Sequence, residues 1–357
     1  MQSIKTLHDF LQKYLILIVL VIAVGASAWG IGSPEVFKPL KGSLPYALFA
    51  MLYPMMIGIN LRSMVLHTSP QKTRYLIILT VAYVLVFPAL AWVTMKFLGW
   101  VMPSIDPAFI AGIVLISLAP IPSSAPAFTG MAGGKTQLVV IGVAWTFVLS
   151  LFVMPFYSHL LLNAVISVPV WTMVKSLLIY IIVPLAAGQL TKYALLHYRG
   201  EDSVKQLKPA FSTLAVFGTL WMVFVVFGLN GRLLSQNVGL IIVTALVMNV
   251  VFLLRMGGNY FAGRFVGLGR EYDATLFYSA GSNMTIATAI AIATWGPLAA
   301  VGVAMGGPFS DMLIMVLFIG VFARMFQRRA AAESDAVASE QVASLQAADP
   351  EQDRTDA

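Results

Sequence analysis

One acidic side chain stands inside a long apolar stretch near the end of the chain. Asp311 lies in the segment Gly306-Gly-Pro-Phe-Ser-Asp-Met-Leu-Ile-Met315. A carboxylate at membrane depth costs roughly 2.5–3.5 kcal/mol on insertion scales, so we expect it to face the protein interior. It could carry a proton or bind a cation there. Alternatively, it could accept hydrogen bonds from hydroxyl groups and hold helices together.

A second segment combines hydroxyl groups with prolines. The stretch Ser117-Leu-Ala-Pro-Ile-Pro-Ser-Ser-Ala-Pro126 places three prolines within seven residues. Each proline removes a backbone donor and clashes with the preceding turn. Because unsatisfied backbone groups are costly in hydrocarbon, such a helix must be interrupted where protein or a water-filled cavity surrounds it. One proline would only kink a helix. Three predict an unwound crossing, with breaks at Pro120, Pro122 and Pro126 and candidate substrate-binding hydroxyls on Ser123 and Ser124.

A matching irregularity occurs in Ser279-Ala-Gly-Ser-Asn-Met-Thr285, where Gly281 lies 159 positions after Pro122. Gly281 and Ser279 mark the predicted break. The polar side chains that could bind a solute there are Ser282, Asn283 and Thr285. Interrupted helices at corresponding positions in two halves of a chain indicate a transporter site. Their free N–H and C=O groups can bind an ion without a charged side chain.

The remaining composition excludes several other chemistries. The chain has no cysteine, so it forms no disulfide, thiolate metal site or cysteine nucleophile. Its four histidines fall at predicted helix ends or loops, without a second metal ligand at helical spacing. No HExxH, GxSxG or paired-carboxylate arrangement lies in an apolar segment. We therefore expect no enzyme activity, no metal centre and no cofactor.

The elements that must position these residues are membrane helices. Of the 357 residues, 59% are hydrophobic and 10% are charged, whereas soluble domains carry about 25% charged residues. A helix needs about 20 mostly apolar residues to cross a bilayer. Ten such segments can be drawn, which predicts an all-α polytopic membrane protein. They are 14–31, 44–61, 75–98, 108–132, 136–158, 169–191, 209–229, 238–256, 272–294 and 298–323.

Lysine and arginine residues indicate how these segments are oriented. Sixteen of them, Arg255 included, fall at the predicted segment ends on one side, and five fall on the other. This asymmetry predicts a protein of the bacterial cytoplasmic (inner) membrane with both termini in the cytoplasm. Basic residues that alternate with long apolar runs fit a lipid environment and not a nucleic-acid partner.

The order of the segments predicts two halves. Residues 1–13 form a cytoplasmic N-terminus, and residues 14–158 and 169–326 each hold five helices. Because five is odd, the halves enter the membrane from opposite faces, as inverted-repeat transporters require. The longest loop is expected at about 192–208. An acidic, aromatic-free tail at 330–357 is predicted to be disordered.

Other intramembrane polar and small residues have simpler roles. We expect Asn60, Gln189, Asn249 and Asn259 to form hydrogen bonds between helices, with lining of the solute path as the alternative for each. Gly302, Gly306 and Gly307 would allow close packing.

Residues 14–326 resemble the bile acid/sodium symporter superfamily, and within it most closely the arsenical-resistance permeases that export arsenite. The resemblance rests on five pieces in order along the chain. They are Met51-Leu-Tyr-Pro-Met-Met-Ile-Gly-Ile-Asn60, Leu118-Ala-Pro-Ile, Val183-Pro-Leu-Ala-Ala-Gly-Gln-Leu-Thr191, Gly281-Ser-Asn283 and Gly307-Pro-Phe-Ser-Asp311. The resemblance implies a panel domain and a core domain, in which the fourth and ninth segments cross at unwound centres.

The chain departs from the patterns of both groups at informative positions. The permeases have a cysteine where this chain has Ile121 and an acidic residue where it has Thr285, while Asp311 matches their glutamate in the last helix. The sodium symporters use a glutamate and an asparagine where this chain has Ser279 and Pro126. These differences favour a proton over sodium as the coupling ion, with Asp311 as its carrier.

These observations predict a secondary transporter that moves a small solute by alternating access. The first hypothesis is proton-coupled efflux of an arsenite- or antimonite-type oxyanion. The alternative is transport of an organic anion, coupled to sodium or protons and held by helix N-termini at the breaks. A membrane-embedded enzyme and a channel are the hypotheses from other classes.

Overall fold

The computed structural model describes residues 2–58 and 69–325, which are helical and contain no β-strand. Six helices in this part of the chain are long and apolar enough to cross a membrane. A further helix pair, Leu17–Gly32 and Pro34–Gly58, is bent by 113°. The predicted all-α polytopic membrane architecture is confirmed. The count of ten spans and the inverted relation of the two halves stay predictions, and the predicted tail 330–357 lies outside the described residues.

The elements follow the predicted apolar segments. The first half contains α1 (Gln2–Gly32), α2 (Leu44–Gly58), α3 (Pro70–Val81), α4 (Phe87–Val101), α5 (Pro107–Leu118), α6 (Ala125–Met131) and α7 (Thr136–Leu162). The second contains α8 (Val170–Arg199), α9 (Glu201–Gln236), α10 (Val238–Phe265), α11 (Asp273–Tyr278), α12 (Met284–Trp295) and α13 (Pro297–Gly306). A π-helical turn, η4 (Ala82–Val86), joins α3 to α4, and another, η6 (Gly307–Asp311), continues α13.

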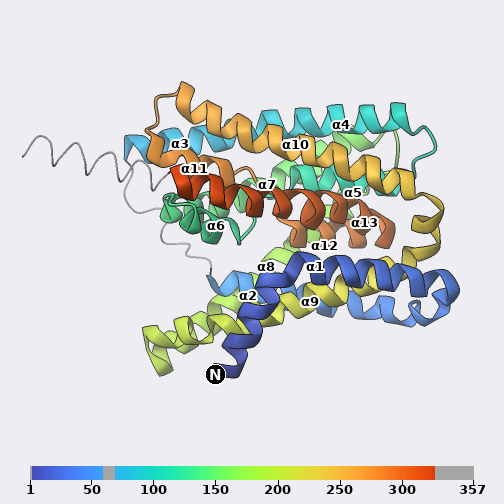
Figure 1. Cartoon of the computed structure of the whole chain (residues 1–357), viewed down its shortest axis with the longest axis horizontal. Coiled ribbons are helices and arrows are strands. Elements are labelled where there is room, and N and C mark those ends of the chain that lie inside the picture. The colour runs from blue at the N-terminus through green and yellow to red at the C-terminus, as the bar shows by residue number, and fades with distance from the viewer. Residues whose placement is uncertain (1, 59–68, 326–357) are drawn as a thin grey trace, which may run out of the picture.

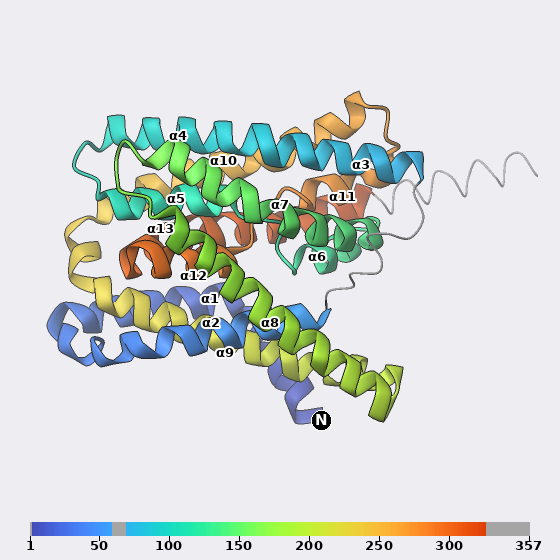
Figure 2. The same cartoon turned by 180° about the vertical axis from the view of Figure 1, so that it is seen from behind.

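The helices form two groups that lie one against the other (Figure 1). Helices α1, α2, α8 and α9 pack together and form the first group. The second contains α3–α7 and α10–α13, with the short helices α5, α6, α11, α12 and α13 between the long ones (Figure 2). Helices α2 and α9 contact α12 and α13 respectively, so the broken helices of the second group border the first.

Small residues hold α5 and α13 close together inside the second group. A Cβ atom added at Gly112 would collide with the backbone carbonyl of Ala299, and one at Gly302 with that of Phe109. The predicted packing role of Gly302 is therefore confirmed. Gly306 is enclosed by the side chains of Ile116 and Met248, and Gly307 by that of Met284.

This packing predicts that Gly112→Ala destabilises the protein by about 1–3 kcal/mol, because the methyl group forces apart two backbones that cannot yield locally. Thermal unfolding of the purified protein would measure the loss. Gly99→Ala in α4 is the matched control, since nothing lies within 4 Å of its Cβ position. Equal stability of the two variants would contradict the close packing.

Two sequence-based boundaries are wrong. The long loop expected at about 192–208 is helical, because α8 continues to Arg199 and α9 begins at Glu201. Only Gly200 breaks the helix there, with a φ of +79°, a conformation that glycine adopts without strain. Helix α10 likewise continues to Phe265 and not to about residue 256. Arg255 therefore lies inside a span and not in a loop.

Candidate functional site

The first helix interruption separates α5 from α6. Helix α5 ends at Leu118 and α6 begins at Ala125, which confirms the predicted break around Pro120 and Pro122. The backbone groups released by the break are bonded to protein side chains. Tyr83 Oη donates to the Leu118 carbonyl at 2.6 Å, and the Ile121 N–H donates to Thr146 Oγ1 at 3.1 Å. The buried part of the interruption, residues 119–121, therefore has these backbone groups bonded within the protein, as membrane depth requires.

The second interruption separates α11, which ends at Tyr278, from α12, which begins at Met284. Ser279 Oγ donates to the Thr275 carbonyl at 2.6 Å and lies 2.7 Å from Tyr75 Oη. The Asn283 side chain caps α12 by accepting from the Ile286 N–H at 3.2 Å. An asparagine N-cap begins a helix in this way by satisfying one of its free backbone donors.

The two interruptions meet. The Asn283 N–H donates to the Pro120 carbonyl at 2.6 Å, which links the segment before α12 to the segment after α5. The Asn283 Nδ2 atom lies 3.4 Å from Met55 Sδ on α2, so this residue also contacts the other helix group. The predicted crossing of the fourth and ninth segments is confirmed by these contacts.

Asp311 lies at this crossing and is 4% exposed. It ends the π-helical turn η6, which Asn249 of α10 holds through hydrogen bonds of 3.1 Å to the Phe309 carbonyl and 3.2 Å to Ser310 Oγ. Asp311 Oδ2 accepts from the Ser282 N–H at 3.1 Å, while Oδ1 has no hydrogen-bond partner among the described residues. A Cβ atom at Gly281 would lie 3.2 Å from both Asp311 Oδ1 and Pro122 Cδ. The carboxylate therefore borders both interruptions.

The structure brings together some of the predicted site residues and not others. Buried at the crossing are Ser279, Gly281, Ser282, Asn283 and Asp311. Thr285 is half-buried in the first turn of α12, and Pro126 is half-buried in the first turn of α6. Ser123 and Ser124 are exposed, so their side chains do not join the buried group. Of the other polar residues, Gln189 donates to the Met56 carbonyl at 2.8 Å, as predicted for a helix–helix contact.

Sequence reasoning missed a buried cation. Arg255 is 1% exposed, and its guanidinium carbon lies 3.9 Å from the centre of the Phe87 ring and 4.8 Å from that of Phe252. Its helix α10 packs against the π-helical turn η6, which ends at Asp311. The sequence does contain a signal for this position, because the apolar run continues past Arg255. Gly257 and Gly258 do not mark the end of the helix there, since glycine is common inside membrane helices.

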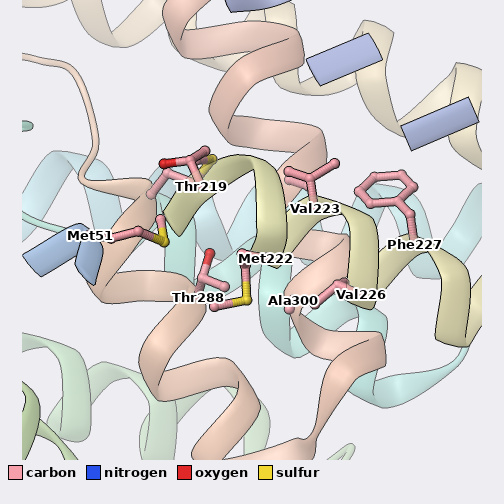
Figure 3. A pocket seen from close by; sticks show the side chains of 10 residues that line it. Met51, Thr219, Met222, Val223, Val226, Phe227, Thr288 and Ala300 are labelled. Carbon is pink, nitrogen blue, oxygen red and sulfur yellow. The ribbon is translucent and has the colours of Figure 1, made fainter. Parts of the chain in front are cut away.

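A small cavity of about 20 Å³ lies between the two helix groups (Figure 3). Helix α9 supplies one wall, and Met51 of α2, Thr288 of α12 and Ala300 of α13 close the other sides. The lining is apolar except for the hydroxyl groups of Thr219 and Thr288. Met284, which directly follows the capping Asn283, also lines it, so the cavity adjoins the crossing. It has room for about one water molecule.

Comparisons with known proteins agree with this architecture. The chain is 23% identical to the Arsenical-resistance protein Acr3 of Corynebacterium glutamicum over 334 residues, 88% of each chain. It is 28% identical to an uncharacterized transporter of Synechocystis sp. over 316 residues, 80% of this chain and 81% of the relative. It is 23% identical to the Sodium/bile acid cotransporter 7 of Mus musculus over 218 residues, 60% of this chain and 62% of the relative.

The sequence model of one protein family matches residues 45–237, which make up more than half of the chain. This stretch includes the first interruption and the helices α2 and α9 that line the cavity. The protein is a multi-pass membrane protein that belongs to the Sodium Bile acid symporter family.

Proposed function

We propose that this protein is a secondary transporter that exports an arsenite- or antimonite-type oxyanion by alternating access, with a proton carried by Asp311 as the coupling ion. The observation that carries the proposal is the position of the Asp311 carboxylate at the crossing of two interrupted helices. One of its oxygens is held by the Ser282 N–H, and the other has no hydrogen-bond partner among the described residues. A carboxylate placed in this way can take up and release a proton without losing its anchor.

A proton fits the surroundings of this carboxylate better than sodium does. Sodium would need several oxygen ligands, but Ser279 Oγ already donates to the Thr275 carbonyl and bonds with Tyr75. Asn283 Oδ1 accepts from the Ile286 N–H. A single free oxygen, Asp311 Oδ1, is enough to bind a proton.

Without cysteine, arsenite would have to be recognised as a hydroxylated solute through hydrogen bonds. Ser282 Oγ is buried and has no partner among the described residues, so it is available to a solute that enters the crossing. In this proposal Asn283, Thr285, Ser123 and Ser124 contribute further polar contacts as the helix groups move apart. The names of two relatives, both Arsenical-resistance protein Acr3, support this substrate class.

The proposal places the protein in the bacterial cytoplasmic membrane, surrounded by lipid, with both termini in the cytoplasm. Its activity is transport and not catalysis, and it needs no cofactor and no nucleic-acid partner. The basis is the distribution of lysine and arginine along the chain and the membership in a symporter family.

The test is arsenite and antimonite accumulation in cells that lack their own exporter. Cells that produce the protein should accumulate several-fold less of either metalloid than cells with an empty vector, because efflux opposes entry. The amount of protein in the membrane is measured in the same cells. Unchanged accumulation with the protein present in the membrane would contradict oxyanion export.

The apolar lining of the cavity favours a second candidate, an organic anion, which would enter as the two helix groups move apart, since the cavity now has room for about one water molecule. Methionine and valine side chains make up half of the lining residues, and flexible methionines adapt to irregular apolar solutes. The relative named Sodium/bile acid cotransporter 7 supports the same class. Competition by amphipathic carboxylates against a bound fluorescent bile-acid analogue would detect such a site, while arsenite should not compete there.

A further inference from the structure

Arg255 is a permanent charge without a hydrogen-bonded partner in the described part of the chain. Its three guanidinium nitrogens are buried, and none has a hydrogen-bond partner among the described residues. Arginine stays protonated in proteins, so it cannot escape the cost of burial by becoming neutral. Stacking on Phe87 and Phe252 lowers that cost but leaves the charge uncompensated.

Two buried carboxylates carry the opposite charge, and one of them ends a turn that packs against the same helix. The structure describes four buried charged side chains: Lys72, Arg255, Asp273 and Asp311. Lys72 lies in the first turn of α3, and Asp273 begins α11 and pairs with Arg264 at 3.1 Å. Arg255 and Asp311 are the two that lie well inside long apolar spans, and the helix that carries Arg255 packs against the turn that ends at Asp311.

The two side chains form neither a hydrogen bond nor a salt bridge, and each has free atoms. Helix α10 carries Arg255, and Asn249 of the same helix holds the turn that ends at Asp311. These hydrogen bonds link the helix that carries Arg255 to the turn that carries Asp311. Because opposite charges attract strongly in a poorly polarisable interior, side-chain movement that brings these two groups together would be favourable.

The neighbouring hydroxyl groups cannot replace either partner. Tyr83, which also interacts with Arg255, donates its hydroxyl hydrogen to the Leu118 carbonyl. Tyr278 donates to the Met315 carbonyl at 3.1 Å, and Tyr75 bonds with Ser279. All three tyrosines are therefore engaged elsewhere. Arg255 is the group that can balance a charged Asp311.

We propose that Arg255 is a built-in cation that balances the Asp311 carboxylate whenever no coupling ion is bound, and so replaces an external cation such as sodium. The inference rests on the proposed role of Asp311 as the carrier of the coupling ion. An uncompensated carboxylate would be expensive at membrane depth in every step of the cycle. A fixed guanidinium removes that cost in the state without the coupling ion.

The decisive experiment is a double-mutant cycle on the purified full-length protein in detergent, read out as thermal unfolding. Arg255→Gln and Asp311→Asn should each lower Tm by about 5 °C or more, because each leaves one buried charge without its opposite. The double variant should lose far less than the two shifts added together. Additive shifts would overturn the proposal, since independent charges do not compensate one another.

A matched control comes from the same helix. Arg264 pairs with Asp273 and not with Asp311, so Arg264→Gln combined with Asp311→Asn should give additive shifts. If Arg255→Gln does not reach the membrane, the yield of a fluorescent fusion is compared instead. Recovery of that yield in the Arg255→Gln/Asp311→Asn variant supports charge balance, and no recovery overturns it.

Sodium provides a second readout that a packing role of Arg255 would not affect. Replacing choline chloride with sodium chloride at equal ionic strength should leave the Tm of the wild-type protein unchanged. A rise in Tm specific to sodium would show an external cation bound beside Asp311 and would overturn the proposal. Neither measurement needs a substrate, so absence of arsenite export would refute the proposed function and leave the test of Arg255 intact.

Discussion

Replacing Asp311 with asparagine is expected to abolish uphill arsenite export while the protein still inserts into the membrane. Asparagine has nearly the same shape, and its carbonyl oxygen can still accept the hydrogen bond from the Ser282 N–H, which is 3.1 Å from Asp311 Oδ2. What it lacks is a group that binds and releases a proton. Arsenite accumulation in exporter-deficient cells should therefore return to the level of the empty vector, a loss of at least about tenfold in export if Asp311 carries the proton.

A surface aspartate supplies the control for this change. Asp106 is exposed and caps α5 by accepting from the Ala108 N–H at 2.8 Å, a role that asparagine also performs. Asp106→Asn should export arsenite as the wild type does. Normal uphill export by Asp311→Asn, at equal amounts in the membrane, would remove Asp311 from the coupling mechanism.

The helix breaks could be predicted from the sequence because their cause is local. Pro120 and Pro122 lie in the observed interruption between Leu118 and Ala125, where each removes a backbone donor. The break predicted at Pro126 is wrong, because this proline lies in the first turn of α6, where a missing N–H costs no helical hydrogen bond. The second break has no proline, yet glycine beside serine and asparagine indicated it correctly. In both cases neighbours along the chain suffice to decide the conformation.

The partners at the crossing could not be predicted in the same way. Tyr75 bonds with Ser279 across 204 positions of sequence, and Asn283 reaches Met55 across 228. Such pairings depend on how complete helices pack, and hydropathy carries no information about that. The exposed positions of Ser123 and Ser124 have the same cause, because composition places them at a break without giving their direction.

The sequence predicts Arg255 at the end of a segment, outside the membrane, for a reason that applies to membrane helices in general. A charge next to two glycines resembles the end of an apolar segment, and a hydropathy argument stops there. The continuation of α10 to Phe265 requires that the charge be tolerated inside, which depends on Phe87 from another helix. The lysine and arginine count that predicted the orientation therefore included Arg255, which is buried inside a span.

Replacing Gly281 is the second change for which we expect a large loss of export, because the crossing leaves no space for a side chain at this position. A Cβ atom there would lie 3.2 Å from both Asp311 Oδ1 and Pro122 Cδ, and would collide with Met315 Cε. Gly281→Val should reduce arsenite export at least about tenfold, because the added groups occupy the space beside the free carboxylate oxygen and press on both interruptions. The methionine can turn aside, but the proline ring and the carboxylate are held by the backbone.

The control for this substitution is Gly320→Val, in the span that carries Asp311, where nothing lies within 4 Å of the Cβ position. Export should stay near the wild-type rate in that variant, with both proteins present in the membrane at similar amounts. If Gly281→Val also exports normally, the crossing does not need its close packing during transport. A proton would then have to reach Asp311 from the side of α10, where Arg255 lies, and not from the side of the second interruption.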